Sequence, residues 1–94
     1  KKVSNRVSKK KSDIGILVCG SGTGMAISAN KTKGIRAVVG YNVKSTQLSR
    51  QHNNANILCL GSRLTKKKDI KKIVSIFLDT KFEGGRHQRR IKKI

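Results

Sequence analysis

The sequence predicts an α/β fold in which helices cover both faces of a parallel β-sheet. Three short apolar runs, at residues 13–19, 35–40 and 56–61, have the length and the β-branched content of buried strands. The segments between them are polar or amphipathic and have helical features. Strands that are apolar on both faces and alternate with helices are typical of parallel sheets with two helical layers. A chain of 94 residues is long enough for a single domain of this kind.

The first half of the chain is expected to contain two helices and two strands. Val3 and Val7 lie four residues apart, which is the spacing of one stripe of an amphipathic helix. Glycines interrupt the first apolar run, and a second helix is expected to follow them and to stop near Gly34. The elements expected are, in order, a helix within residues 1–11, a strand at 13–19, a helix at 25–30 and a strand at 35–40.

The second half is expected to contain a helix, a strand, a further helix and a basic tail. Asn42 is a candidate N-cap for the first of these helices. The last helix has the clearest pattern, because its apolar residues recur at i, i+3, i+4, i+7 and i+8; they are Ile70, Ile73, Val74, Phe77 and Leu78. The elements expected are a helix at 42–54, a strand at 56–61, a helix at 65–82 and a basic segment at 84–94.

The net charge of +19, from 23 basic and 4 acidic residues, favours an acidic partner such as nucleic acid. The basic residues gather near both ends and at 66–72, whereas Lys31 and Lys33 are the only charged residues from position 14 to position 35. Aromatic residues make up 3% of the chain, which leaves few platforms for stacking on bases. We therefore expect a solvated basic surface without a specific nucleic-acid partner; a basic nucleic-acid-binding module is the alternative.

Neither a membrane segment nor a metal site is predicted. No apolar stretch is long enough to cross a bilayer, and the basic amino-terminus lacks the apolar region of a signal peptide. Cys19 and Cys59 lie in or beside apolar runs, without the CxxC or Cys/His spacing of a metal site. These features predict a cytoplasmic protein with reduced thiols.

A cysteine followed by three alternating glycines, in VCGSGTGMA at residues 18–26, is the strongest candidate for a functional site. A strand, a glycine loop and a helix N-terminus together present N–H groups to an anion, although a plain tight turn is the alternative. Cys19 is at the carboxyl end of a strand, where open α/β sheets bind ligands. A thiol close to a helix N-terminus ionises readily and can act as a nucleophile or a base. Cys59 is interpreted as an inert buried thiol.

Two polar segments further along the chain are weaker candidates. His52 lies in RQHNNAN just before the third strand, and the neighbouring Asn53 offers a side-chain amide to sugar hydroxyl groups; a surface histidine at a helix end is the alternative. Arg86 and Arg90 would share one face of a helix, where two guanidinium groups suit a phosphate. The alternative is a solvated basic tail, and His87 is interpreted as a surface residue.

The segments GILVCGSGTGMAISANKTKGIRAVVGYNVKSTQLSRQHNNANILCLGSRL and FEGGRHQRRIKKI resemble the type B ribose-5-phosphate isomerases, whose wider family includes the galactose-6-phosphate isomerase subunits. The resemblance covers essentially the whole chain. It implies a Rossmann-like, three-layer αβα fold and an aldose–ketose isomerase that interconverts ribose 5-phosphate and ribulose 5-phosphate through an enediolate. It also implies that no metal or organic cofactor is needed, and that the active site is shared between two subunits of a homodimer or higher homo-oligomer.

The resemblance further implies roles for single residues. Cys19 matches the catalytic base, His52 the acid that opens the furanose ring, and Asn53 a ligand of the sugar hydroxyls. Ser21 stands where a threonine is commoner in the family, and its hydroxyl is expected to keep the same role. The glycines of the enediolate-binding loop and the phosphate-binding arginines match Gly20, Gly22, Gly24, Arg63, Arg86 and Arg90.

One feature of the family has no counterpart in this sequence. The family begins with a strand that carries an Asp-His pair, which helps to bind substrate. The chain is therefore expected to correspond to the carboxy-terminal part of the enzyme, without the first strand–helix unit. An inactive isomerase fragment is accordingly an alternative to an active enzyme, and ribose 5-phosphate, allose 6-phosphate and galactose 6-phosphate are all candidate substrates.

Overall fold

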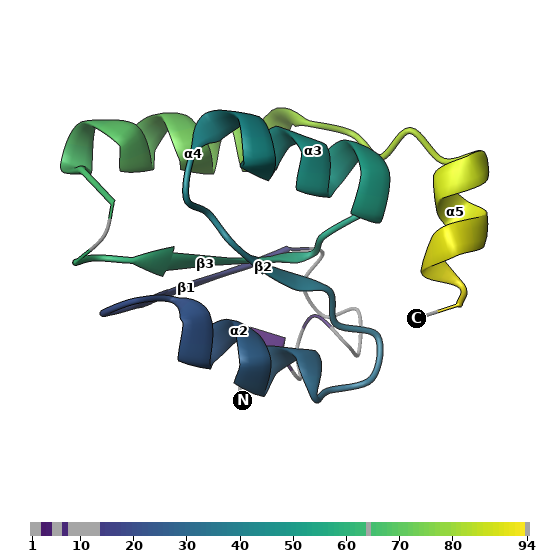
Figure 1. Ribbon diagram of the computed structural model, residues 1–94, viewed down its shortest axis with the longest axis horizontal. Helices are drawn as coiled ribbons and strands as arrows, with labels where there is room; N and C mark the ends of the chain where they lie inside the picture. Colours follow the sequence, from purple (N-terminus) through teal and green to yellow (C-terminus); the bar gives the residue numbers. More distant parts are fainter. Residues whose placement is uncertain (1–2, 5–6, 8–13, 64, 94) are drawn as a thin grey trace.

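The computed structural model describes residues 3–4, 7, 14–63 and 65–93 and has three parallel strands between helical layers (Figure 1). The strands are β1 (Gly15–Cys19), β2 (Ala37–Val39) and β3 (Ile57–Gly61). The helices are α2 (Thr23–Asn30), α3 (Val43–Asn53), α4 (Lys67–Asp79) and α5 (Arg86–Ile91). This architecture confirms the predicted α/β fold.

The expected elements occur in the expected order, with shifted ends. Helix α2 starts two residues before the predicted one, because Gly22 adopts a φ of 83° and turns the chain into the helix there. Asn42 is the N-cap of α3, as predicted, and its Oδ1 accepts a hydrogen bond of 2.8 Å from the Ser45 N–H. Of the helix expected within 1–11, residues 3, 4 and 7 are helical, and the remainder lies outside the described residues.

Strand β3 lies at the centre of the sheet, and β1 and β2 pair with its two edges in parallel. Gly15 lies opposite Ile57, and Cys19 lies opposite Gly61. Because the two strands run in parallel and in this register, their carboxyl ends reach the same edge of the sheet. The loops that follow β1 and β3 are therefore neighbours.

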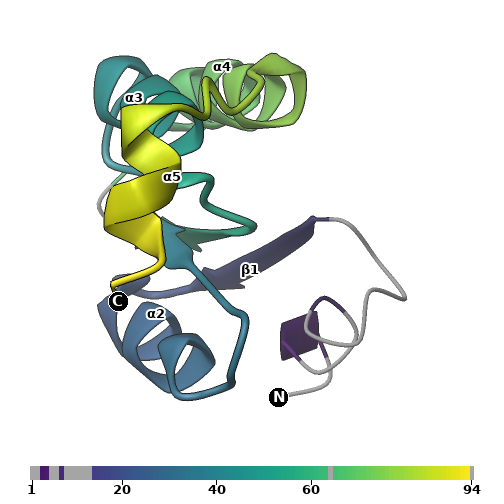
Figure 2. The same cartoon turned by 90° about the vertical axis from the view of Figure 1, so that its right-hand side faces the viewer.

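Both faces of β3 are buried, and this gives the sheet two cores. Side chains alternate along a strand, so Ile57 and Cys59 face one core whereas Leu58 and Leu60 face the other. Helix α2 covers the first core, and α4 covers the second together with α3 (Figure 2). The further buried members are Val7, Ala26, Ala29, Ile35 and Ala37 in the first core, and Ala55, Ile73 and Phe77 in the second.

The amphipathic pattern of α4 directs its apolar face to the second core. Ile73 and Phe77 are fully buried, and Ile70 and Val74 pack at the border of the same cluster. Leu78, the last residue of the pattern, is 53% exposed. It lies about 80° around the helix axis from Ile70, at the edge of the apolar stripe.

The end of β3 lies directly against the glycine loop. A Cβ atom at Gly61 would lie 2.5 Å from the backbone oxygen of Ser21, so the two segments pass each other only because residue 61 is glycine. Two backbone hydrogen bonds join the same segments: the Ser62 N–H donates to the Cys19 carbonyl at 2.7 Å, and the Arg63 N–H donates to the Gly20 carbonyl at 3.0 Å. The loop after β1 is thus fixed to the loop after β3.

We predict that Gly61→Ala lowers the free energy of unfolding by about 1–3 kcal/mol, because the new methyl group overlaps backbone atoms that cannot move aside on their own. Gly24→Ala is the matched control, since a Cβ there has no neighbour within 4 Å. Alanine in place of this helical glycine is expected to raise the free energy of unfolding by about 0.4–1 kcal/mol. Urea denaturation followed by circular dichroism measures both variants, and equal stabilities would contradict the close contact.

Candidate active site in two halves

The first half is the loop between β1 and α2. Cys19 ends β1 and is partly exposed, and its Sγ accepts a hydrogen bond from the Gly22 N–H with an N-to-S distance of 3.0 Å. The Gly22 N–H is thus aimed at the sulfur atom and fixes the position of the Cys19 side chain at the start of the loop. Helix α2 starts directly after Gly22, and the positive end of its dipole adjoins the sulfur.

A cavity of about 530 Å³ adjoins this thiol. The Arg63 side chain lies over Gly20, with its Nε 3.3 Å from the position that a Cβ atom would occupy. Gly22 is buried and lies outside the lining of the cavity. The residues that line it are Cys19, Gly20, Ser21, Gly24, Met25 and Arg63. The structure therefore places Arg63 with the cysteine loop.

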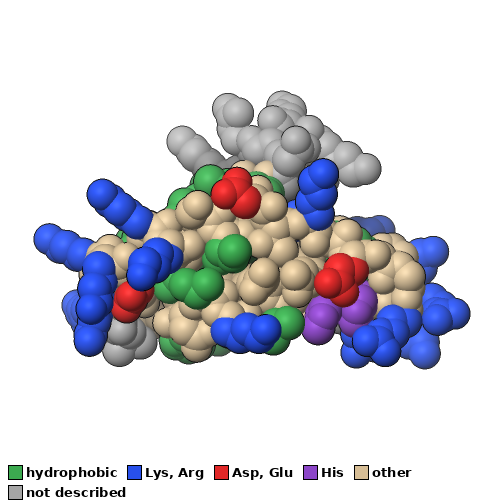
Figure 3. All heavy atoms as spheres, turned by 90° about the horizontal axis from the view of Figure 1, so that it is seen from above, with side chains coloured by type: hydrophobic (Ala, Val, Ile, Leu, Met, Phe, Trp, Pro, Cys, Tyr) green, Lys and Arg blue, Asp and Glu red, His purple; other side chains and the backbone are tan. Residues whose placement is uncertain are grey.

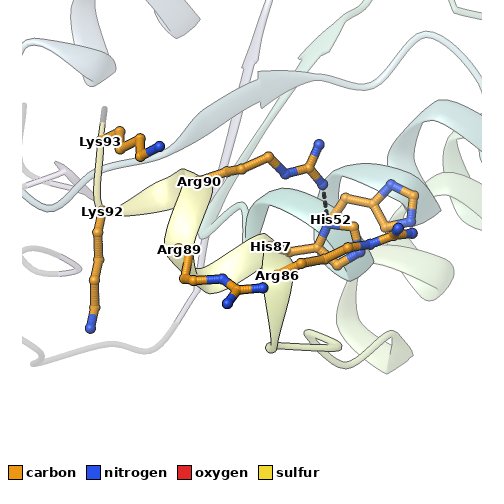
Figure 4. A pocket seen from close by; sticks show the side chains of 7 residues that line it. All are labelled: His52, Arg86, His87, Arg89, Arg90, Lys92 and Lys93. Atoms are coloured by element: carbon orange, nitrogen blue, oxygen red, sulfur yellow. Dashed lines mark hydrogen bonds between the residues drawn. The ribbon is translucent and has the colours of Figure 1, made fainter.

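The second half is a larger cavity, of about 790 Å³, beside the end of α3 and helix α5 (Figure 4). Arg86 and Arg90 lie one helical turn apart on α5, and His52 reaches the same cavity from α3. Its lining residues are His52, Arg86, His87, Arg89, Arg90, Lys92 and Lys93. So many positive side chains around one cavity suit an anion with more than one charge.

The interpretation of His87 as a surface residue is wrong, because only 5% of it is exposed. Its ring stacks on that of His52, with centroids 4.3 Å apart and planes at 14°. Its Nδ1 accepts a hydrogen bond from the Arg90 guanidinium, drawn as the dashed line in Figure 4. The burial depends on α5 packing against the end of α3, a contact between segments that are more than thirty residues apart in sequence.

Glu83 is a second residue that the sequence did not single out. Its Oε1 lies 3.6 Å from His87 Nε2 and 3.9 Å from His52 Nε2. Figure 3 shows the histidine side chains with an acidic side chain against them, beside a group of lysines and arginines. One carboxylate therefore faces both imidazoles at the border of a basic cavity.

The environment of His87 favours its neutral form. Burial lowers the pKa of His87, and the charges of His52, Arg90 and Arg86 lower it further, whereas Glu83 raises it. A neutral ring also fits the contact with Arg90, because arginine can only donate and the accepting Nδ1 must keep its lone pair. The proton of neutral His87 is then on Nε2, the nitrogen that faces Glu83.

His52, Glu83 and His87 form the one group of possible metal ligands found among the described residues, with their ligand atoms within 4.8 Å of one another. The hydrogen bond from Arg90 opposes such a site. It occupies the lone pair of His87 Nδ1 and leaves the proton on Nε2, which is the nitrogen that a metal ion would need. The surrounding lysines and arginines also repel a cation.

The two halves of the site lie at opposite ends of the strands: one at their carboxyl ends and the other at their amino ends. Cys19 is at the carboxyl end of β1, whereas α3 runs back from the carboxyl end of β2 to the amino end of β3 and carries His52 with it. A strand of five residues, such as β3, spans about 16 Å. Figure 1 shows α5 at the end of the sheet away from the loop that enters α2. Asn53 is exposed at the end of α3 and lines neither cavity.

Comparison with known proteins assigns the chain to a family. Residues 1–94 match the family described as Ribose/Galactose Isomerase. The chain belongs to this family. It is 50% identical over 93 residues to the probable ribose-5-phosphate isomerase B of Mycoplasma genitalium, and 52% identical over 82 residues to the ribose-5-phosphate isomerase B of Escherichia coli. These matches cover 98% and 87% of the chain.

Solved structures of the family share the fold. The type B ribose 5-phosphate isomerase of Trypanosoma brucei superposes with a TM-score of 0.96 at 44% identity, over 98% of the chain and 62% of that protein. The isomerase B of Mycoplasma genitalium, solved with bound ribulose-5-phosphate, gives a TM-score of 0.93 at 48% identity, over 98% of the chain and 61% of that protein. The Rossmann-like form of the predicted fold is thereby confirmed.

The chain is shorter than these relatives. It spans 61% of the Mycoplasma genitalium sequence and 55% of the Escherichia coli sequence, or roughly three fifths of the length of the proteins it matches. Within the described ranges, no helix is both long and apolar enough to cross a membrane.

The two cysteines are predicted to differ sharply in reactivity. Burial raises the pKa of Cys59 to about 11, with a further contribution from Cys19, and the residue is fully buried. At a pH of about 8, iodoacetamide should alkylate Cys19 and spare Cys59, because the thiolate is the reactive species and needs access. Peptide mass spectrometry measures both sites. A Cys19→Ser control should react only after urea exposes Cys59; comparable native rates at the two thiols would contradict the prediction.

Proposed function

We propose that the chain contributes the catalytic machinery of a sugar-phosphate isomerase that interconverts ribose 5-phosphate and ribulose 5-phosphate. The observation that carries the proposal is the Cys19 thiol, which accepts the Gly22 N–H bond at the wall of a cavity that Ser21 also lines. Membership of the isomerase family supports it, as does the ribulose-5-phosphate in the Mycoplasma genitalium relative. No metal or organic cofactor is required for this chemistry.

The proposed reaction moves one proton between two neighbouring carbons. The Cys19 thiolate removes the proton from the hydroxyl-bearing carbon next to the carbonyl group, which gives an enediolate, and the thiol returns this proton to the former carbonyl carbon. The hydroxyl proton passes from one oxygen of the enediolate to the other, so that the new carbonyl group lies on the neighbouring carbon. Negative charge grows on oxygen in the transition state. The Ser21 hydroxyl and the N–H groups of the loop would stabilise that charge without reorganising. Gly20 and Gly24, which line the cavity, would let the backbone approach the substrate closely.

The second cavity would hold the other end of the substrate. Arg86 and Arg90 would bind the phosphate, and His52 would donate the proton that opens the furanose ring. Arg63, which lies with the cysteine loop, is proposed to bind the phosphate group from that side. Asn53 is proposed to bind a sugar hydroxyl group.

We further propose that each complete site forms between two copies of the chain. The two cavities lie at opposite ends of the strands, which are about 16 Å long. A pentose phosphate is shorter than this, so one substrate molecule does not reach both cavities of the same chain. A homodimer with two-fold symmetry solves this problem, because the cysteine loop of one copy can face α5 of the other, twice per dimer. Higher oligomers built from such dimers would work in the same way.

Cys19→Ala is predicted to lower kcat by about 10²- to 10⁴-fold with little change in KM, because it removes the base and leaves the phosphate contacts intact. Ser21→Ala should lower kcat by about 10²- to 10³-fold, the usual loss of one oxyanion donor. Isomerase assays with ribose 5-phosphate measure both. The chain is assayed by itself and preceded by the front segment that the family resemblance implies. Near-normal turnover of Cys19→Ala would refute its role as the base.

Mixing two inactive variants is predicted to restore activity. Cys19→Ala and Arg90→Ala each disable both sites of their own dimer. A mixed dimer has one site with both substitutions and one site with neither. An equal mixture, unfolded and refolded together, should therefore recover about a quarter of the wild-type activity. If the complete site lay within one chain, the mixture would be as inactive as either variant alone.

A further inference from the structure

Glu83 is an unexpected residue at the border of a cavity that is proposed to bind phosphate. The chain has only 4 acidic residues against 23 basic ones. A carboxylate 3.6 Å and 3.9 Å from the two histidines of this cavity would by itself repel an anion. A favourable effect of Glu83 on anion binding must therefore outweigh the repulsion between its carboxylate and the anion.

The backbone holds Glu83 between two helices. Its N–H donates a 3.0 Å hydrogen bond to the carbonyl of Gln51, in the last turn of α3. Gly84 and Gly85 follow with φ values of 71° and 57°, a conformation that favours glycine, and they turn the chain directly into α5. The carboxylate thus sits where the end of α3 meets the start of α5.

The side chains that meet there form a chain of contacts that ends at a phosphate-binding arginine. Arg90 donates to Nδ1 of His87, which requires His87 to carry its proton on Nε2. The Glu83 carboxylate faces that Nε2 and favours the proton there by electrostatic attraction. Without Glu83, the tautomer with the proton on Nδ1 gains population, and this form cannot accept from Arg90.

We propose that Glu83 is a positioning residue for anion binding: through His87 it holds the Arg90 guanidinium in the cavity, without touching the anion itself. The inference rests on the proposed function in one respect, namely that Arg90 binds the phosphate. The groups that face His87 are His52 from α3, Glu83 from the connecting segment, and Arg86 and Arg90 from α5. Protonation of His87 at low pH removes the lone pair of Nδ1 that accepts from Arg90, so low pH weakens the same contact as loss of Glu83.

The tautomer of His87 provides the first test, and it needs no assay of activity. Long-range proton–nitrogen NMR spectra of the ¹⁵N-labelled chain at a pH of about 7.5 distinguish the two ring nitrogens of each histidine. We expect His87 to carry its proton on Nε2 in the wild type and to become a mixture of tautomers in Glu83→Ala. A wild-type His87 with its proton on Nδ1 would overturn the proposal, and so would an unchanged tautomer in the variant.

Affinity for inorganic phosphate provides the second test, by isothermal titration calorimetry at fixed ionic strength. Glu83→Ala should bind phosphate about three- to tenfold more weakly, although it makes the chain more positive. Glu83→Gln, which keeps an oxygen acceptor, should lose less. Asp69→Ala is the matched control, because it removes one carboxylate from the first turn of α4, away from the cavity, and should bind at least as tightly as the wild type.

The variants separate this inference from the proposed function. Arg90→Ala is titrated in parallel, and circular dichroism verifies that each variant is folded. If Arg90→Ala binds phosphate as tightly as the wild type, the proposed phosphate site is refuted. If Arg90→Ala binds weakly but Glu83→Ala binds as tightly as Asp69→Ala, only the positioning role of Glu83 is overturned.

Discussion

The parallel pairing of β3 with both other strands is the constraint on which the rest of the structure depends. This strand is apolar on both faces, so it can lie only at the centre of a sheet with helices above and below. Its position brings the carboxyl end of β1 beside Gly61, and the glycine lets the cysteine loop pass within contact distance. The candidate base is therefore positioned by the core of the domain.

The same topology explains why the candidate site is divided. A helix that connects two parallel strands must return along the sheet, so residues at its end lie at the edge opposite to the loops that follow the strands. His52 is one such residue, and α5 packs beside it. The proposed site uses residues from both ends of the sheet, and a symmetric dimer would bring the two halves together without any new element in the fold.

Local surroundings give chemically similar residues different roles. Cys19 and Cys59 lie on paired strands, yet Cys59 is enclosed in the core with a raised pKa, whereas Cys19 meets an N–H donor at a cavity. His52 and His87 stack on each other, yet His87 is the buried member and accepts a hydrogen bond from Arg90. In both pairs, one residue is buried and the other is more exposed, and the more exposed residue is the one proposed to act on the substrate.

The sequence by itself determined the class of the fold, the order of its elements and the cysteine–glycine loop. Those features are local: they follow from the period of apolar residues and from the glycines after a strand. It also identified Arg86 and Arg90 as a pair, because i and i+4 spacing places residues on one helical face. Tertiary structure alone decided that Arg63 lies with Cys19, that His87 is buried and that Glu83 faces two histidines. These contacts join segments distant in sequence, and no local pattern encodes them, because they depend on how α5 and α3 pack and on which edge of the sheet each loop reaches.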